Sequence, residues 1–272
     1  MDKEKLTYLT EQAKKIRCTT IEMIGTLGVG HIGGSMSIVE LLTAIYYETA
    51  NVDPKDPLKA DRDRVVLSKG HAGPALYSTL AEKGFFPREW IYTLNKPGTK
   101  LPSHVDRTKT PGIDMTAGSL GQGISAAVGM AIAAKMDKNP CNVYAIVGDG
   151  ESQEGQVWEA LMLAGSKKLD NLIVFVDSNK MQIDGMCEDV NGVEDFVEKG
   201  NAFRFYTQRI NGHDIEAIVD AINNAKAQHD KPSMIVLDTI KGKGYALGEG
   251  KVSCHSMQMT EEEWKAAVEA NK

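Results

Sequence analysis

Two polar segments of this sequence each follow an apolar run rich in β-branched residues. Residues 143–147 lead into Gly148-Asp149-Gly150, and residues 172–176 lead into a segment that ends in Asn179. Asp-Gly alone is a common turn dipeptide, so its position after a buried strand is what favours a ligand role. Because carboxyl ends of parallel strands meet at one sheet edge, Asp149 and Asn179 are expected to hold a hard cation. One carboxylate and one amide bind Mg²⁺ weakly, so the pair implies a ligand with a diphosphate group.

Histidines form a second group of candidate residues. Two of the six lie in or beside helical stretches and are interpreted as structural or surface residues, namely His213 and His229. The other four lie in loops, mostly beside glycine or a strand end: His31, His71, His104 and His255. At one sheet edge they would move protons or orient hydroxyl groups near neutral pH. None has a cysteine or glutamate at zinc-like spacing, so a zinc site is disfavoured.

Charged residues at strand ends both support and oppose an anion-binding site. Lys69 and Lys241 each follow a predicted strand and would pair with an anion, or else are solvated loop charges. Glu151 and Glu154 follow Asp149 and add negative charge near the same place. A cation between them and the diphosphate would offset that charge. Glu154 is interpreted equally well as a helix N-terminal residue stabilised by the macrodipole.

The elements that must position these residues alternate between strands and helices. Strands are expected at residues 64–67, 143–147, 172–176, 204–210 and 234–240. Helices are expected at residues 3–24, 74–83, about 123–136 and 193–199, with others after a Ser37/Glu40 capping box, after residue 212 and after a Thr260/Glu263 cap. This alternation predicts an α/β fold, a doubly wound, mostly parallel sheet with helices on both faces, in one domain over residues 1–272.

Composition excludes several classes of protein. The chain has 272 residues and a formal charge of −6, which argues against a general nucleic-acid-binding surface. The charged start of the chain and the short apolar runs predict neither a signal peptide nor a membrane span, so a cytoplasmic protein is expected. The four cysteines are widely separated, so they are interpreted as buried or incidental thiols rather than a disulfide framework.

The motifs together resemble the thiamine diphosphate enzymes, and within them the transketolase family. The Gly148-Asp149-Gly150 motif with Asn179 is similar to that family's metal and diphosphate motif. Further motifs follow in the family's order: Gly30-His31, Ser68-Lys69-Gly70-His71-Ala72, Pro102-Ser103-His104, Gly118-Ser119-Leu120-Gly121-Gln122-Gly123, Lys241-Gly242 and His255. They span residues 30–255, so the resemblance covers nearly the whole chain.

The resemblance implies a role for each matching residue. Asp149, Asn179 and the backbone carbonyl of Met181 would bind Mg²⁺. The diphosphate would be met by His71, Gly150, Lys241 and His255, with Lys69 and Glu154 as further candidates. The thiazolium and aminopyrimidine rings would be held by Gly118, Ser119, Leu120 and Ile183. The substrate hydroxyls would be contacted by His31, His104 and His255. The implied reaction transfers a two-carbon ketol unit from a ketose phosphate to an aldose phosphate.

The resemblance also implies a partner. Full transketolases are more than twice as long, and their second domain binds the aminopyrimidine and supplies an activating glutamate. The chain therefore resembles the amino-terminal subunit of a split transketolase. It is expected to form a heterotetramer of two plus two with a separate carboxyl-terminal subunit. Groups that read the sugar phosphate would lie largely on that partner.

Three other interpretations stay open at this point. One is a related thiamine enzyme subunit, such as a deoxyxylulose-phosphate synthase or a transketolase for an unusual sugar or sulfo-sugar. Another is a non-catalytic subunit that retains the fold. A magnesium-dependent nucleotide-binding protein is disfavoured, because the glycine fingerprint expected after the first strand is absent.

Overall fold

The computed structural model describes residues 1–193 and 195–272. Its centre is a five-stranded sheet in which every pairing is parallel, and the strands lie in the order β2-β3-β4-β6-β5. The strands are β2 (Arg64–Leu67), β3 (Val143–Gly148), β4 (Leu172–Ser178), β5 (Tyr206–Asn211) and β6 (Ser233–Asp238). Every residue of β3 and β4 is buried, as expected for strands covered on both faces. The predicted doubly wound α/β class is confirmed.

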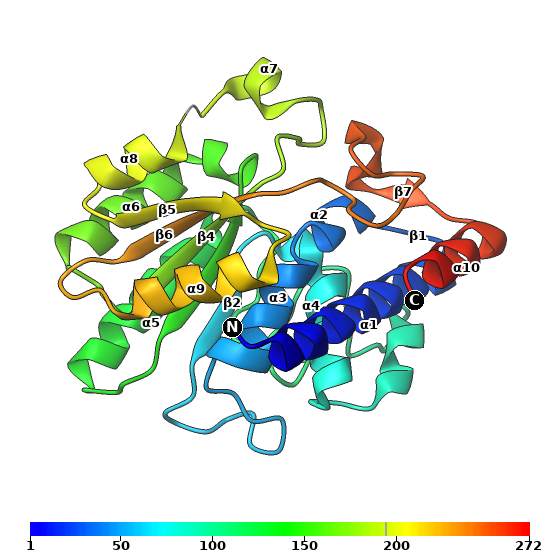
Figure 1. The fold of residues 1–272 in the computed structure, drawn as a ribbon, viewed down its shortest axis with the longest axis horizontal. Coiled ribbons are helices and arrows are strands. Elements are labelled where there is room, and N and C mark those ends of the chain that lie inside the picture. The colour runs from blue at the N-terminus through cyan, green and yellow to red at the C-terminus, as the bar shows by residue number, and fades with distance from the viewer. Residues whose placement is uncertain (194) are drawn as a thin grey trace.

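Helices cover both faces of this sheet, and the side chains of β4 show how. Ile173 and Phe175 belong to the apolar cluster on one face, whereas Val174 and Val176 belong to the cluster on the other. The first face packs against α1 (Lys3–Leu27), α3 (Val39–Ala44), α4 (Gly73–Lys83) and α9 (Ile215–Lys226). The second face packs against α5 (Gln122–Met136), α6 (Gly155–Ser166) and α8 (Phe196–Ala202). Figure 1 shows α5 and α6 on the side of the molecule away from α1.

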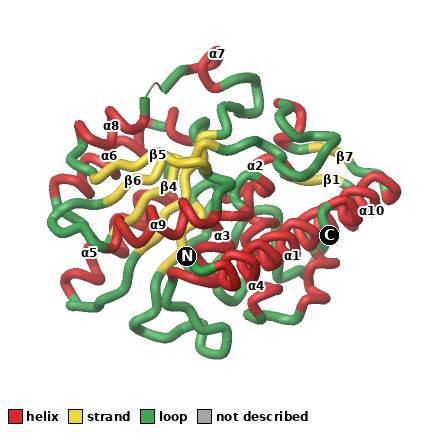
Figure 2. Tube along the Cα trace, viewed as in Figure 1, coloured by secondary structure: helices red, strands yellow, loops and turns green. Residues whose placement is uncertain are grey.

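A second, smaller sheet brings two distant parts of the chain together. Strands β1 (Val29–Gly30) and β7 (Met257–Gln258) pair antiparallel, apart from the main sheet (Figure 2). Helix α10 (Glu261–Ala270) then packs along α1, where Trp264 lies against Gly25. This pairing carries the loop before α2 (Ile32–Met36) next to the segment around His255.

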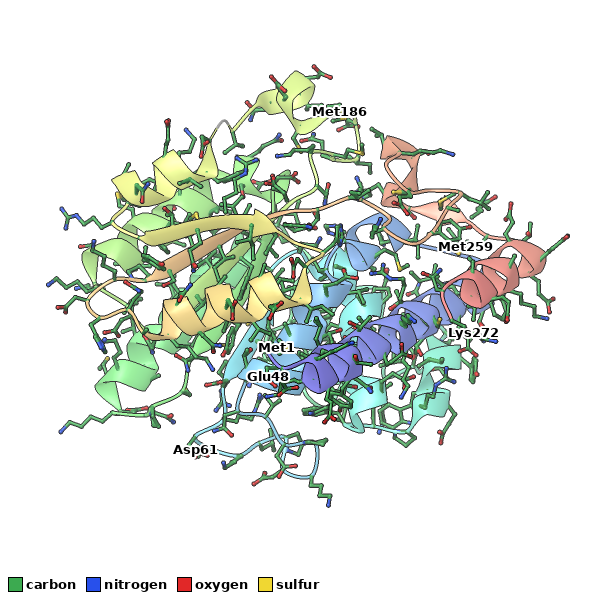
Figure 3. All side chains as sticks on the ribbon, viewed as in Figure 1. Met1, Glu48, Asp61, Met186, Met259 and Lys272 are labelled. Carbon is green, nitrogen blue, oxygen red and sulfur yellow. The ribbon has the colours of Figure 1, made fainter. Side chains whose placement is uncertain are left out.

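Short elements complete the chain. A π-helical turn (Ile45–Thr49) follows α3, and its Glu48 is labelled in Figure 3. Lys5 at the amino end of α1 pairs with Glu48 at 2.7 Å. Helix α7 (Cys187–Asn191) stands out from the body of the molecule in Figure 1. Turns of 3₁₀ helix cover Gly70–Ala72, Arg88–Thr93, Glu151–Gln153 and Val252–His255. Across residues 1–193 and 195–272, no helix combines the length and the apolar character needed to cross a membrane.

The Ser37/Glu40 capping box was a wrong prediction, although the terminal Thr260/Glu263 box is confirmed. Helix α3 begins at Val39 with no side-chain cap. The hydroxyl of Ser37 instead donates to the carboxylate of Asp177 at 2.7 Å, and Glu40 pairs with Arg17. Ser37 has helical backbone angles at the end of α2, whereas an N-cap residue needs extended angles, so it does not cap α3.

Several element boundaries also differ from the sequence prediction; β6, for example, ends at Asp238 and not at residue 240. The strand expected from residue 204 begins at Tyr206 in β5, an edge strand in which no residue is fully buried. The short helix expected at residues 193–199 is α8, which begins at Phe196; Glu194 lies outside the described residues. Both segments lack the strong apolar period that defines the central elements.

Candidate active site

A pocket of about 280 Å³ lies at the carboxyl edge of the main sheet. Most residues selected from the sequence line it: Asp149, Asn179, Met181, Gly150, Ile183, Gly118, Leu120, Lys69, Lys241, His31, His71, His104 and His255. Many of them follow β2, β3, β4 and β6, because the strands of a parallel sheet all end at this edge. Gly148 and Glu151, which the sequence analysis placed near this site without a ligand role, also line it, and Gly34 and Gln182 are lining residues that it did not select.

Ser119 and Glu154 do not line this pocket. Ser119 is exposed in the loop before α5. Glu154 is also exposed and occupies the N-cap position of α6, where its side chain makes no capping hydrogen bond. The geometry therefore puts Glu154 at a helix start, the second of its two interpretations, and its cofactor role stays a prediction.

The four loop histidines form one cluster. The ring centroid of His31 lies 5.6 Å from that of His71, 5.5 Å from His104 and 5.4 Å from His255. The rings of His71 and His255 are 5.1 Å apart. His31 is thus the centre of a group drawn from four loops that are far apart in the sequence.

All four imidazoles are held in the neutral form near pH 7. Burial is the main cause that lowers the pKa of His31, His71 and His104. Burial and the Lys241 ammonium lower the pKa of His255 to about 4. A neutral imidazole has one N–H donor and one acceptor nitrogen, so the cluster can both donate to and accept from hydroxyl groups.

Asp149 is a buried carboxylate at the end of β3, with 5% of its surface exposed. The backbone N–H groups of Gly150 and Lys180 donate to it at 2.8 Å and 2.5 Å. Burial, with a contribution from the Asp177 carboxylate, nevertheless raises its pKa to about 6. A carboxylate in this state is stabilised by a cation, which would favour the charged form.

Asn179 is held in one orientation by hydrogen bonds on both sides of its amide. Its Nδ2 donates to Asp177 at 3.0 Å, and its Oδ1 accepts from the backbone N–H of Met181 at 3.1 Å. Because the carboxylate of Asp177 accepts only, the amide nitrogen must face it. The oxygen therefore lies on the Met181 side of the amide, next to the other oxygen donor expected to hold a hard cation.

Asp177 is a fully buried residue that the sequence interpretation did not select. It pairs with Lys69 and accepts hydrogen bonds from Ser37 at 2.7 Å and Thr239 at 2.5 Å. Burial raises the pKa of Asp177, but the Lys69 ammonium outweighs it and the net pKa is lowered. The charge of Lys69 is thus already balanced within the protein. The sequence feature that could have identified Asp177 is its position as a polar residue in the otherwise apolar, buried β4.

Glu151 is also buried, and it joins the end of β3 to the glycine-rich loop before α5. Its carboxylate accepts from Ser68 Oγ at 2.5 Å, from the Gly121 N–H at 2.9 Å and from the Gly148 N–H at 3.0 Å. These bonds position the loop that carries Gly118 and Leu120 beside the pocket.

Lys241 reaches into the pocket from the loop after β6. Its Nζ lies 3.3 Å from the carbonyl oxygens of Met181 and Gln182 and 3.4 Å from His255 Nδ1. Burial lowers the pKa of Lys241. Its ammonium contacts only neutral groups here, so it remains available to an anion that enters the pocket.

The residues present fit a Mg²⁺–diphosphate group. The carboxylate of Asp149, the amide of Asn179 and the carbonyl of Met181 supply oxygen atoms only, the donor set of a hard cation. In the described part of the chain, no three His, Cys, Asp or Glu side chains form a metal-binding group. A cation here therefore needs further oxygen atoms from a ligand and water, and Lys241 provides charge for the anion.

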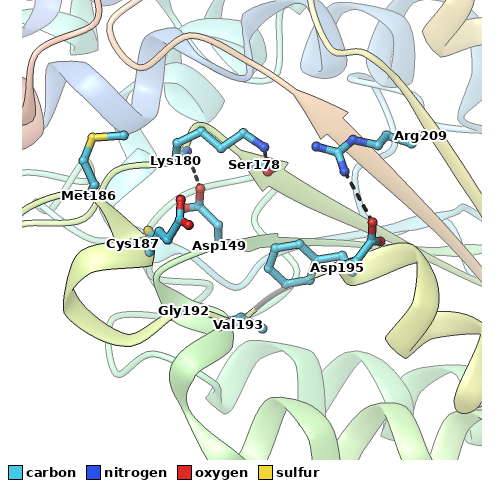
Figure 4. A pocket seen from close by; sticks show the side chains of 11 residues that line it. Asp149, Ser178, Lys180, Met186, Cys187, Gly192, Val193, Asp195 and Arg209 are labelled. Carbon is cyan, nitrogen blue, oxygen red and sulfur yellow. Dashed lines mark hydrogen bonds and ion pairs between the residues drawn. The ribbon is translucent and has the colours of Figure 1, made fainter.

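A second pocket, of about 430 Å³, lies on the other side of Asp149 (Figure 4). In its lining, Arg209 contacts Asp195 and also Asp238 outside it, and Lys180 donates to Ser178 at 3.1 Å. Of the residues selected from the sequence, only Asp149 lines this second pocket, so we place the candidate active site in the first pocket.

Comparison with known proteins defines the class. The family model described as "Transketolase, thiamine diphosphate binding domain" matches residues 9–271. The chain belongs to the transketolase family, whose members are transferases, as the sequence motifs predicted.

Two relatives match over nearly their whole length. The chain is 57% identical to the 6-deoxy-6-sulfo-D-fructose transketolase subunit SqwG of Clostridium sp. (strain MSTE9), over 96% of this chain and 94% of the relative. It is 39% identical to an apulose-4-phosphate transketolase subunit of Phocaeicola vulgatus, over 94% of this chain and 91% of the relative.

Solved transketolases share the fold but are much longer. The Campylobacter jejuni enzyme superposes with a TM-score of 0.92 at 34% identity, covering 100% of this chain and 43% of that one. The Leishmania mexicana enzyme gives a TM-score of 0.90 at 32% identity, covering 96% of this chain and 41% of that one. The chain thus spans about two fifths of these enzymes.

Proposed function

We propose that this chain is the amino-terminal, diphosphate-binding subunit of a two-chain transketolase. It uses thiamine diphosphate and Mg²⁺ to transfer a two-carbon ketol unit from a ketose to an aldose. The observation that carries the proposal is the meeting of the Asp149/Asn179 oxygen pair and four neutral histidines in one pocket. Relatives that match over their whole length and are named as subunits support it.

Each part of the pocket has its own task in this proposal. Asp149, Asn179 and the carbonyl of Met181 hold Mg²⁺, and Lys241 with His71 and Gly150 meets the diphosphate. Gly118, Leu120 and Ile183 contact the rings. The cofactor, when bound, supplies the nucleophilic carbon that makes carbon–carbon bond cleavage beside a carbonyl feasible.

The histidines act on the substrate. His31, His104 and His255 orient the hydroxyl and carbonyl groups of the transferred unit, and as neutral imidazoles they can accept and return a proton. The cluster is partly buried in this chain, so exclusion of water from it is assigned to the bound cofactor and the partner subunit. Ser119 and Glu154 lie outside the pocket lining and have no task in this proposal.

A partner chain completes the site. The aminopyrimidine end of the cofactor and the activating glutamate are assigned to a separate carboxyl-terminal subunit, and the assembly to a heterotetramer of two plus two. Exposed residues around the pocket mouth, Gly118 and Ile183 among them, are consistent with a surface that a partner covers. The isolated chain is expected to bind the cofactor weakly and to turn over no sugar.

The donor sugar is proposed from the relatives. The 57% identical relative is named for 6-deoxy-6-sulfo-D-fructose, against 39% identity for the subunit named for apulose 4-phosphate. We therefore place 6-deoxy-6-sulfo-D-fructose first and a ketose phosphate second. The transferred two carbons are the same in the sulfo-sugar and an ordinary ketose phosphate, so the histidine cluster suits both.

Reconstitution tests this function. The chain is combined with the carboxyl-terminal subunit of a two-chain transketolase, and ketol transfer to an aldose phosphate is followed by product analysis. Each donor is offered separately, 6-deoxy-6-sulfo-D-fructose and xylulose 5-phosphate. Activity with either donor, lost in Asp149→Ala, supports the proposal. No transfer from either donor contradicts it, and activity that survives Asp149→Ala indicates a non-catalytic subunit.

A further inference from the structure

Lys241 is the second residue of a tight turn that follows β6, and we call residues 240–243 the Lys241 turn. The backbone N–H of Lys243 donates to the carbonyl of Ile240 at 3.2 Å and closes this turn. Gly242, the third residue, has a φ of +76°, the left-handed angle that a type II turn requires there. Only 2% of Lys241 is exposed, so the position of the turn sets where its side chain enters the pocket.

His213 holds the first residue of the Lys241 turn. The backbone N–H of Ile240 donates to Nε2 of His213 at 2.8 Å, and Nδ1 of the same ring lies 3.0 Å from Oε2 of Glu40. Because Nε2 accepts, the proton of the neutral imidazole lies on Nδ1 and is donated to the Glu40 carboxylate. A second proton on the ring would set two N–H groups against each other at Ile240. His213 is therefore a neutral bridge between a carboxylate and the turn.

Arg17 holds the last residue of the Lys241 turn. Its Nη1 donates to the carbonyl of Lys243, and its Nη2 pairs with Oε1 of Glu40. Burial raises the pKa of Glu40, but the hydrogen bond from His213 and the charge of Arg17 outweigh it, so the net pKa is lowered. The two oxygens of one buried, charged carboxylate thus bind the two side chains that hold the two ends of the turn.

This network reaches Lys241 from outside the candidate active site. Arg17, Glu40 and His213 line a separate groove beside α1, where their side chains are mostly buried. They connect α1, α3 and the loop before α9 to the segment after β6. The Lys241 ammonium is a charge on a flexible stem, and its attraction to an anion falls with distance. A turn held at both ends therefore fixes the place of that charge in the pocket.

We propose that Glu40 positions Lys241 for the diphosphate of the cofactor, acting through His213 at one end of the Lys241 turn and Arg17 at the other. This inference rests on the proposed function and adds three positioning residues to it. The sequence analysis interprets His213 as structural or surface, and its contacts give that structural role a consequence in the pocket.

Two substitutions at His213 separate its two hydrogen bonds. His213→Gln places an amide oxygen near the position of Nε2, so it keeps an acceptor for the Ile240 N–H. His213→Asn places its amide near the position of Nδ1, so it keeps the bond to Glu40 while Ile240 loses its acceptor. His229→Asn, at an exposed position, is the matched control. Each full-length variant is mixed with the carboxyl-terminal subunit of a two-chain transketolase and titrated with thiamine diphosphate in excess Mg²⁺ by calorimetry.

His213→Asn is expected to weaken thiamine diphosphate binding about tenfold, within the range for coupled residues of one hydrogen-bond network. His213→Gln and His229→Asn should stay within about threefold of the wild type. In a chain that also carries Lys241→Met, His213→Asn should cause less than about a twofold further loss, because the lysine through which it acts is gone. A purely structural histidine would weaken binding equally in both chains and would not be replaced by glutamine.

Arg17→Lys tests the other end of the turn independently. A lysine keeps a positive charge beside Glu40, but its single nitrogen cannot also reach the carbonyl of Lys243. This variant is expected to weaken binding about as much as His213→Asn, and again only while Lys241 is present. It replaces His213→Asn if circular dichroism shows that the asparagine variant does not fold.

The contrary results are distinct. Unchanged affinity in His213→Asn overturns the inference and leaves the proposed function standing. Equal losses in His213→Asn and His213→Gln also overturn it, because the hydrogen bond to Ile240 is then not what matters. A loss that persists undiminished beside Lys241→Met overturns it too, since His213 then acts on packing or on another part of the pocket. A wild-type chain that binds no thiamine diphosphate with its partner chain removes both this inference and the proposed function.

Discussion

The carboxylate of Asp177 accepts a hydrogen bond from the side-chain amide of Asn179 at 3.0 Å and pairs with the ammonium of Lys69. One buried residue therefore fixes the orientation of a proposed metal ligand and balances the charge of a pocket lysine. The ends of β2, β4 and β6 are joined through it, because Thr239 also donates to it at 2.5 Å. The pocket depends on this carboxylate even though Asp177 does not line it.

Asp177→Asn is expected to destabilise the chain by about 3–5 kcal/mol, because it leaves the ammonium of Lys69 buried without a counter-charge. Urea unfolding of the ligand-free chain measures this effect. Asp170→Asn is the control, since Asp170 pairs with Lys135 near the surface and its loss should cost less than about 1 kcal/mol. Equal effects of the two substitutions would show that the Asp177 network carries no special stability.

Glu151→Gln tests the link between β3 and the loop before α5. Gly121 and Gly148 donate to the two different oxygens of the carboxylate, and glutamine replaces one of these with an NH₂ donor, so a loss of about 1–3 kcal/mol is expected. Thiamine diphosphate should also bind more weakly, because the loop with Gly118 loosens. Unfolding and calorimetric titration check the two effects. Glu269→Gln, a surface control paired with Lys272, should change neither.

Substitution of alanine at two glycines is expected to change the stability of the chain in opposite directions. A Cβ at Gly33 would lie 2.6 Å from the Cys254 carbonyl oxygen and 3.0 Å from Lys241 Cγ. Gly33→Ala is therefore expected to cost about 1–3 kcal/mol and to displace Lys241. Gly129 in α5 has no neighbour within 4 Å of such a Cβ, so Gly129→Ala should stabilise the isolated chain by about 0.5–1 kcal/mol. Thermal unfolding of both variants compares them, and a destabilised Gly129→Ala would contradict the packing described here.

The main fold was predictable because its strands are apolar on both faces. β3 and β4 are buried throughout, and their sequences show it as unbroken apolar runs. β5 lies at the edge of the sheet with mixed burial, so its start was predicted two residues early, at 204 instead of Tyr206. A local pattern defines an element less well where the element is only half covered.

The pocket was predictable where glycine-rich turns end strands, and not where distant residues meet. Ser37 and Glu40 match a capping box, but Ser37 is drawn to Asp177, which lies 140 residues away in the sequence. Gln182 carries no motif, and its unpaired oxygen is a property of the three-dimensional surroundings. Long-range hydrogen bonds of this kind have no local signature in a sequence.

The histidine cluster predicts how the stability of the ligand-free chain depends on pH. Burial lowers the pKa of His31, His71, His104 and His255 in the folded chain below the ordinary 6.5 of an exposed imidazole. As pH falls through about 6.5 the unfolded chain therefore takes up protons that the folded chain does not. The stability contribution is fully present above that pH and is lost progressively toward pH 4, the region of the folded pKa of His255.

Substitution within the cluster should reduce this dependence. The free energy of unfolding, measured in urea at intervals from about pH 8 to pH 5, is expected to fall less steeply for His255→Gln than for the wild type. His71→Asn should act in the same direction, because burial, Lys69 and the neighbouring histidines lower the pKa of His71. His229→Gln, at an exposed position, should leave the profile unchanged. A wild-type slope that persists in both cluster variants would place the acid sensitivity outside the histidines and contradict the neutral cluster on which their proposed role depends.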